Sequence, residues 1–144
     1  MKLDDIFDLW KEDSYFERDE LTEETLRIPQ LHSKYLRTLS QERIRLKMFE
    51  SDYKKLYRIM HEYYRGDLDG DTLKQMGWSQ NPLKILRQDL DMYIQQDEDI
   101  IDMSNKVTLQ KEKISLVESI MQQISNRGYQ IKSIIDWEKF KAGL

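Results

Sequence analysis

The chain has 144 residues, 35% of them charged, with only five glycines, two prolines and a mean hydropathy of −0.78. This composition is typical of long solvated helices and argues against a sheet protein or a disordered chain. The absence of cysteine excludes a disulfide framework and thiolate chemistry. No apolar run approaches the roughly 20 residues that cross a bilayer, and the acidic N-terminus is unlike a signal peptide.

Charge is segregated along the chain. The formal net charge is −7 over residues 1–26, +6 over 27–65, −6 over 66–104 and +3 over 105–144. Blocks of alternating sign can pair within or between protomers, and a free basic block attracts phosphates. The alternative is that the charge of solvated helix faces varies by chance, which ten basic residues within 27–65 make less attractive.

The N-terminal segment, residues 1–20, is predicted to be a short helix and a connector. Apolar residues recur at helical spacing over 3–12, with Phe7 and Trp10 as bulky anchors.

A long basic helix is predicted over residues 21–66. Its 3-4 heptad seam is broken only by His32 and Glu42, and five repeats favour packing along another long helix. The seam positions are Ile28, His32, Tyr35, Leu39, Glu42, Leu46, Phe49, Tyr53, Leu56, Met60 and Tyr63.

The ends of this helix carry recognisable signals. Thr22 is a plausible N-cap, and Gly66 is a natural C-terminal glycine. Pro29 either opens the helix at its first turn or kinks one that began near Glu23, and both alternatives stay open.

Residues 67–82 are predicted to be a turn and linker. Aspartates alternate from Asp67 to Asp71, as in a Ca²⁺ loop, but Thr72 and Trp78 stand where such a loop needs glycine and glutamate. A polar turn is the better interpretation. Asn81-Pro82 suits an N-cap followed by a first helical residue.

A second long helix is predicted over residues 83–127, antiparallel to the first. The acidic run at 97–99 marks a possible restart of this helix, and Gly128 is expected to end it. A second apolar line gives the helix two faces to bury, which argues for oligomerisation. Its heptad register includes Ile100, Met103, Val107, Gln110, Ile114, Val117, Met121 and Ile124, and the second line is Ile101, Leu109, Leu116 and Ile120.

The C-terminal segment, residues 128–144, is predicted to be a helix too apolar to face water. It is either a docked core helix or an oligomerisation helix, and the residues alone leave the two about even. The expected oligomer interface consists of Ile120, Ile124, Tyr129, Ile131, Ile134, Ile135, Trp137 and Phe140.

Catalytic chemistry finds little support in the sequence. The only histidines, His32 and His61, are too far apart on one helix to converge, and no nucleophile–base pair, metal-ligand cluster or glycine-rich phosphate loop occurs. We therefore expect a non-enzyme with no cofactor and no metal.

Binding of a single strand needs cations for phosphates and aromatic rings for bases, and the end of the basic helix offers both. The alternative is that the tyrosines are seam residues and the cations are merely solvated. The candidate DNA-binding residues are the cations Lys54, Lys55, Arg58 and Arg65, with Tyr57, His61 and Tyr64 along a neighbouring stripe.

Several strings resemble the UvsY recombination mediators of T-even-like phages and their cyanophage relatives. They are Glu62-Tyr63-Tyr64-Arg65-Gly66, Leu86-Arg87-Gln88-Asp89-Leu90-Asp91, and Asn126-Arg127-Gly128-Tyr129-Gln130-Ile131-Lys132 leading into Asp136-Trp137-Glu138-Lys139-Phe140.

The resemblance implies a non-catalytic factor of phage recombination and repair in the host cell cytoplasm. Such mediators form ring-like homo-oligomers, bind single-stranded DNA and contact the phage recombinase and single-stranded-DNA-binding protein. It also implies a basic cluster before the Tyr-Tyr string, matched by Lys54, Lys55 and Arg58, whereas Met60 stands where the family can carry arginine.

Two functions are therefore weighed. The first is a mediator that loads the recombinase onto DNA covered by single-strand-binding protein. The second is a structural coiled-coil or scaffold protein without nucleic-acid binding. Both share one all-α domain over 1–144, an elongated antiparallel hairpin of long helices with short terminal helices, in a ring-like homo-oligomer and away from membranes.

Overall fold

The computed structural model describes residues 1–81 and 85–144. Within these ranges the regular structure is helical and no strand occurs, which confirms the all-α fold class. The elements in chain order are α1 (Leu3–Asp13), α2 (Leu21–Arg65), α3 (Gly70–Met76), the 3-10 helix η1 (Arg87–Asp89), α4 (Leu90–Gln96) and α5 (Glu98–Lys141).

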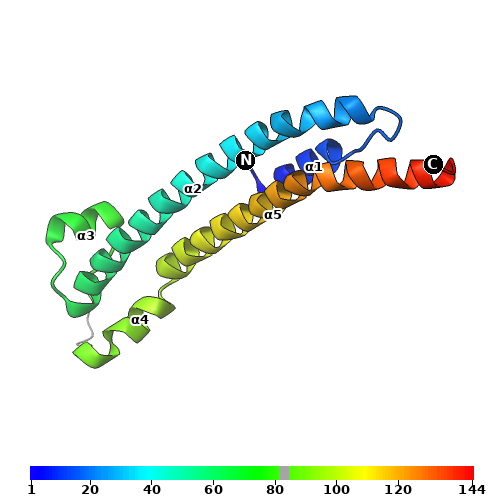
Figure 1. The fold of residues 1–144 in the computed structure, drawn as a ribbon. Coiled ribbons are helices and arrows are strands. Elements are labelled where there is room, and N and C mark those ends of the chain that lie inside the picture. Colours follow the sequence, from blue (N-terminus) through cyan, green and yellow to red (C-terminus); the bar gives the residue numbers. More distant parts are fainter. Residues whose placement is uncertain (82–84) are drawn as a thin grey trace. The chain divides into compact units, whose positions relative to one another are not determined.

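The chain forms two compact units. Unit 1 combines Met1–Ile44 with Gln110–Leu144, and unit 2 is Arg45–Leu109. Each unit contains part of α2 and part of α5, and within each the two helices run antiparallel (Figure 1). The pairing of two heptad helices predicted from the sequence is thus confirmed unit by unit.

In unit 1, helix α1 packs onto the two long helices. Ile6 and Tyr35 are fully buried, and the ring of Trp10 meets that of Tyr35 edge-on, with centroids 5.5 Å apart. The Asp13 carboxylate accepts hydrogen bonds from the Tyr35 hydroxyl (2.8 Å) and the Lys34 ammonium (2.6 Å). Burial alone would raise the pKa of Asp13, but these hydrogen bonds hold it below its usual value.

The apolar core of unit 1 follows the predicted heptads in part, with five of its nine buried apolar side chains at heptad positions. Each fully buried isoleucine or leucine contributes roughly 2 kcal/mol of hydrophobic free energy. The buried apolar side chains of unit 1 are Ile6, Leu31, Tyr35, Leu39, Ile114, Val117, Ile120, Ile124 and Ile131.

Two polar residues, Glu42 and Gln110, one from each seam, meet in this core. The Gln110 amide donates to the Glu42 backbone carbonyl (2.8 Å) and to its carboxylate (2.5 Å), and both residues are buried. A polar pair at heptad positions favours one register over its neighbours, since a shifted register would leave both groups unpaired. Glu42 therefore helps to fix the register of the seam.

A buried ion pair ties the first turns of α2 to α5. The Arg127 guanidinium lies 2.5 Å from the Glu24 carboxylate, with both side chains less than a tenth exposed. The same guanidinium donates to the carbonyls of Ser14 (3.5 Å) and Tyr15 (3.4 Å) and lies 5.0 Å from the Phe16 ring. Arg127 is thus a structural cation of unit 1.

Unit 2 has a smaller core, in which α4 packs against the end of α2. In it, Met60, Ile94 and Ile100 are nearly inaccessible to solvent. The burial of Met60 agrees with its predicted place on the seam. The partly buried side chains packed on this core are Tyr53, Leu56, Tyr57, Tyr64 and Trp78.

Two predicted helix ends are confirmed. Helix α2 ends at Gly66, whose φ is 80°, and the Asp67 amide donates to the Glu62 carbonyl at 2.9 Å. The chain restarts as α5 after Asp97, whose carboxylate accepts the Asp99 amide at 2.9 Å.

Gly128 was predicted to end a helix, and this is wrong because α5 continues through it to Lys141. The buried face continues across the glycine as Ile124, Arg127 and Ile131, at helical spacing. Packing of these three side chains offsets the roughly 1 kcal/mol that glycine costs in a helix. The predicted separate C-terminal helix is therefore the last part of α5.

The segment after α2 also differs from its prediction. The predicted linker contains α3, because the Asp69 carboxylate caps the Thr72 amide at 3.2 Å and Gly77 ends the helix with φ 69°. The helix predicted over 83–127 is broken into η1, α4 and α5. Its first residues, with Pro82, lie outside the described residues.

Smaller corrections concern the N-terminal half. Helix α2 begins at Leu21, so Thr22 lies inside the first turn and Pro29 inside the helix. Phe7 was predicted to anchor the N-terminal helix, but it is 53% exposed. Ile6 is buried in its place. His32 is exposed, since Leu31 on the adjacent position fills the core.

Candidate nucleic-acid interface

The last turns of α2 present exposed cations. Lys54, Lys55 and Arg58 are all exposed, and none pairs with a carboxylate among residues 1–81 and 85–144. At about 100° per residue, Lys54 and Arg58 lie on one side of α2, opposite the core residue Met60, and Lys55 lies beside them. The helix thereby directs these charges toward solvent.

Two aspartates, Asp91 of α4 and Asp97 just before α5, accept hydrogen bonds from tyrosines of α2. The Tyr57 hydroxyl donates to Asp91 and the Tyr64 hydroxyl to Asp97, each at 2.7 Å. The bond to Asp91, with some burial, raises the pKa of Tyr57, and burial with the bond to Asp97 raises the pKa of Tyr64. These phenols therefore remain neutral donors.

The tyrosines predicted as stacking platforms thus have structural roles. The rings of Tyr57 and Tyr64 pack on the core of unit 2, and Tyr64 also contacts Tyr63 and Tyr93. A ring already packed on protein has little free face for a base. The proposed interface is therefore not built on Tyr57 and Tyr64, whose hydroxyls and rings are engaged within the protomer, and their contact with DNA stays a prediction.

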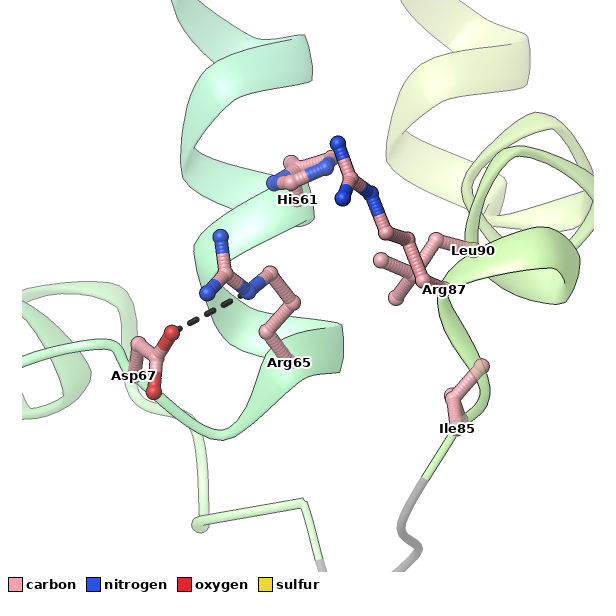
Figure 2. A pocket seen from close by; sticks show the side chains of 6 residues that line it. All are labelled: His61, Arg65, Asp67, Ile85, Arg87 and Leu90. Atoms are coloured by element: carbon pink, nitrogen blue, oxygen red, sulfur yellow. Dashed lines mark ion pairs between the residues drawn. The ribbon is translucent and has the colours of Figure 1, made fainter.

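His61 and Arg65 lie at a pocket of about 430 Å³ at the end of α2. Figure 2 shows their side chains pointing into the same space as Arg87, which comes from η1. The Arg65 guanidinium pairs with Asp67 at 3.2 Å. Ile85 and Leu90 complete the described lining.

Arg87 was not among the residues predicted to bind DNA. It belongs to the string Leu86-Arg87-Gln88-Asp89-Leu90-Asp91, which carries part of the family resemblance and contains no other basic residue. Its proximity to His61 depends on how α4 packs against α2, and this packing cannot be predicted from spacing in the sequence. The family string was the one available signal.

The predicted oligomer interface divides into two groups. Ile120, Ile124 and Ile131 are buried within unit 1, so they are not available for a partner, and this part of the prediction is corrected. The other group lies on the last turns of α5 and is half-buried or exposed, with Trp137 and Phe140 stacked at 5.6 Å. That group is Tyr129, Ile134, Ile135, Trp137 and Phe140.

The chain matches proteins of phage recombination along nearly its whole length. The family model described as "Recombination, repair and ssDNA binding protein UvsY" matches residues 9–144. The recombination protein uvsY of Enterobacteria phage T4 is 23% identical over 143 residues, which cover 99% of both chains.

Solved structures with the same fold include two crystal forms of the bacteriophage T4 recombination mediator protein UvsY. The lattice type II structure has a TM-score of 0.85 at 22% identity, covering 99% of this chain and 98% of that one. The lattice type IV structure has a TM-score of 0.85 at 21% identity, covering 97% and 99%. Since the family model spans all but the first eight residues, this chain belongs to the UvsY family of recombination, repair and single-stranded-DNA-binding proteins.

Proposed function

We propose that this protein is a recombination mediator of a phage. In this role it binds single-stranded DNA as an oligomer and helps load the phage recombinase onto DNA covered by the single-stranded-DNA-binding protein, in the host cell cytoplasm. It acts by binding and carries out no catalytic step. Membership of the UvsY family supports the recombination and DNA-binding parts of the proposal.

The observation that carries the proposal is the row of exposed cations on α2, Lys54, Lys55 and Arg58. A lysine or arginine already paired with a carboxylate gains little by binding a phosphate, because it must give up that partner. These three cations have no such partner in the described parts of the chain. A phosphate backbone would therefore bind them without breaking an ion pair.

Fluorescence anisotropy with a labelled oligothymidylate tests the DNA-binding part. The triple variant Lys54→Ala, Lys55→Ala, Arg58→Ala should lose affinity by on the order of a hundredfold or more at low salt. Its plot of log affinity against log salt should be shallower by about 0.7 for each phosphate that the variant no longer binds.

A matched control removes the same charge elsewhere. Lys111, Lys132 and Lys139 are exposed, belong to unit 1 and have no carboxylate partner in the described ranges. Replacing these three lysines by alanine should leave affinity within about threefold, because only long-range charge changes. Equal losses of affinity in both triple variants would contradict the proposed interface.

The oligomer is supported by the apolar end of α5. Trp137 is 54% exposed and Phe140 72% exposed, and the stacked pair forms an exposed apolar surface near the end of α5. Exposed aromatic patches of this kind are typical of subunit interfaces. In a homo-oligomer, each weak DNA site would be repeated, which multiplies the affinity for a long strand.

Light scattering measures this part directly. Wild-type protein should have the mass of several protomers at micromolar concentration, and Trp137→Ser with Phe140→Ser should shift it toward the monomer mass of 17.5 kDa. Helical content should not change, since neither side chain belongs to the core. A wild-type protein that stays monomeric would contradict the oligomer.

The mediator step has its own test. The protein should shorten the lag before the phage recombinase assembles on DNA coated with single-stranded-DNA-binding protein, and the α2 triple variant should not. A scaffold protein would share the heptads, but it would neither bind the oligonucleotide nor shorten the lag. The exposed cations of α2 favour the mediator over this alternative.

A further inference from the structure

In the pocket at the end of α2, a cation from outside that helix joins its basic face. Arg65 and His61 come from α2, and Arg87 comes from η1, more than twenty residues further along the chain. Figure 2 shows the three side chains turned toward a common space. Arg87 is not among the binding residues predicted from the sequence.

The position of the pocket continues the exposed row of α2. At about 100° per residue, His61 and Arg65 lie within roughly 40° of Lys54 around the helix axis. Arg58 lies on the same side. At a rise of about 1.5 Å per residue, Lys54 and Arg65 are separated by about 16 Å along the axis. A strand held by the row would therefore reach the pocket.

The chemistry of the pocket suits an anion of phosphate size attached to an organic group. Its described lining contains two guanidinium groups and one carboxylate, so it is positively charged even with His61 neutral. Guanidinium groups bind phosphate through two parallel N–H donors. Ile85 and Leu90 offer apolar contact for the sugar or base next to the phosphate.

Arg87 is available for such a ligand. It is exposed and has no carboxylate partner among residues 1–81 and 85–144. Arg65 differs, because Asp67 holds it at 3.2 Å with both side chains more than half exposed. An exposed ion pair of this kind is weak, so a phosphate can replace Asp67 as the partner of Arg65.

We propose that Arg87, with His61 and Arg65, binds a backbone phosphate of the single strand whose other phosphates lie on the exposed cations of α2, and that Asp67 competes with this phosphate for Arg65. The inference rests on the proposed function and extends it to a second element, the η1 segment. It assigns Arg87 as a phosphate-binding residue and Asp67 as an attenuator of DNA affinity.

The test compares single variants in the anisotropy assay. Arg87→Gln should weaken oligothymidylate binding by on the order of fivefold and reduce the salt slope by about 0.7, the change expected for one phosphate on a single strand. Arg87→Lys should recover part of the affinity. The weakening should be the same for an oligonucleotide of mixed sequence, because a phosphate contact carries no sequence information.

Asp67→Asn gives a change of opposite sign. It should strengthen binding by about twofold to fivefold, because Arg65 is released and one negative charge leaves the pocket. Arg37→Gln is the matched control: Arg37 is exposed, lies in unit 1 and has no carboxylate partner in the described ranges. Affinity should change by less than about twofold in this control, because only long-range charge changes.

The outcomes separate the inference from the proposed function. If the α2 triple variant loses binding while Arg87→Gln binds like wild type, the assignment of Arg87 as a phosphate-binding residue is overturned and the α2 interface stands. If the wild-type protein binds no single strand, both are overturned. An Asp67→Asn variant that binds more weakly than wild type would overturn the assignment of Asp67. The urea midpoint of each variant should match wild type, since all three side chains are exposed.

Discussion

Units 1 and 2 use the same two long helices but differ in how acidic side chains link different elements of the fold. In unit 1, acids pair with cations: Glu24 with Arg127, Asp13 with Lys34, and Glu118 with Arg43. In unit 2, Asp91 and Asp97 accept hydrogen bonds from the hydroxyls of tyrosines on α2. A tyrosine satisfies an aspartate without using a positive charge.

In the proposed function, this difference leaves cations at the end of α2 available to DNA, whereas Arg27, Lys34 and Arg43 of unit 1 are held in ion pairs. Where arginine and lysine hold the fold together, they are unavailable to a phosphate. In unit 2 the hydroxyls of Tyr57 and Tyr64 make the links to acidic side chains. Lys54, Lys55 and Arg58 remain unpaired within the described residues. The net charge of residues 27–65 alone would have predicted DNA binding along the whole segment.

The largest expected effect comes from breaking the buried ion pair of unit 1. Arg127→Met should reduce the free energy of unfolding by about 3 kcal/mol, because Glu24 would stay buried with only two longer contacts, each of 3.4 Å, to the Arg27 guanidinium and the Glu17 amide. Urea denaturation measures this, with Arg18→Met as the matched control. Arg18 pairs with Glu138 at the surface, so its removal should cost less than about 1 kcal/mol. Equal destabilisation by both variants would show that Arg127 is not a structural cation.

The next effect breaks the corresponding link of unit 2. Tyr64→Phe should cost about 1–2 kcal/mol of stability, because the partly buried Asp97 carboxylate loses the hydroxyl donor to one of its oxygens and keeps only the Asp99 amide on the other. Tyr57→Phe should cost less, since its hydrogen bond to Asp91 is exposed. DNA affinity of both folded variants should stay near that of wild type. A large loss of affinity with normal stability would instead restore the tyrosines as DNA contacts.

The same link predicts a dependence on alkaline pH. Because folding raises the pKa of Tyr64 above its ordinary value of 10.0, its contribution to stability is complete below about pH 10 and is lost as the pH rises further. Urea unfolding at about pH 8 and about pH 11 should show a smaller alkaline loss of stability for Tyr64→Phe than for wild type. Identical losses would mean that Tyr64 is not linked to folding in this way.

The smallest effect concerns the continuity of α5 in unit 1. Gly128 is helical and exposed, and a Cβ added there would meet no atom within 4 Å. Gly128→Ala should therefore raise the free energy of unfolding by about 0.5–1 kcal/mol. A destabilised variant in thermal or urea unfolding would favour a helix break at this glycine, as its position in the sequence suggests.

Periodicity predicted the parts of the fold that repeat along the chain. The 3-4 spacing placed Tyr35, Leu39 and Met60 in the core and indicated an antiparallel partner helix. Local signals were less reliable: Gly66 ends a helix and Gly128 does not. The difference is that buried Arg127 and Ile131 continue the packed face past Gly128, which only the folded chain reveals.

The candidate site was predictable only in part. The exposure of Lys54, Lys55 and Arg58 could be predicted because an exposed helix face follows from spacing alone. The roles of Tyr57 and Tyr64 could not, because their partners Asp91 and Asp97 are more than thirty residues away. Arg87 was missed for the same reason, and the apolar residues Ile120 and Ile124 were assigned to an interface although the protomer buries them.

Lysine acetylation, read by mass spectrometry with and without bound oligothymidylate, tests the central claim most directly. DNA should protect Lys54 and Lys55 of unit 2 strongly, because their ammonium groups would hold phosphates. It should leave Lys132 and Lys139 on α5 as reactive as in the free protein. Equal protection of all four lysines, or protection of the α5 pair alone, would contradict the assignment of DNA binding to the unpaired cations of α2.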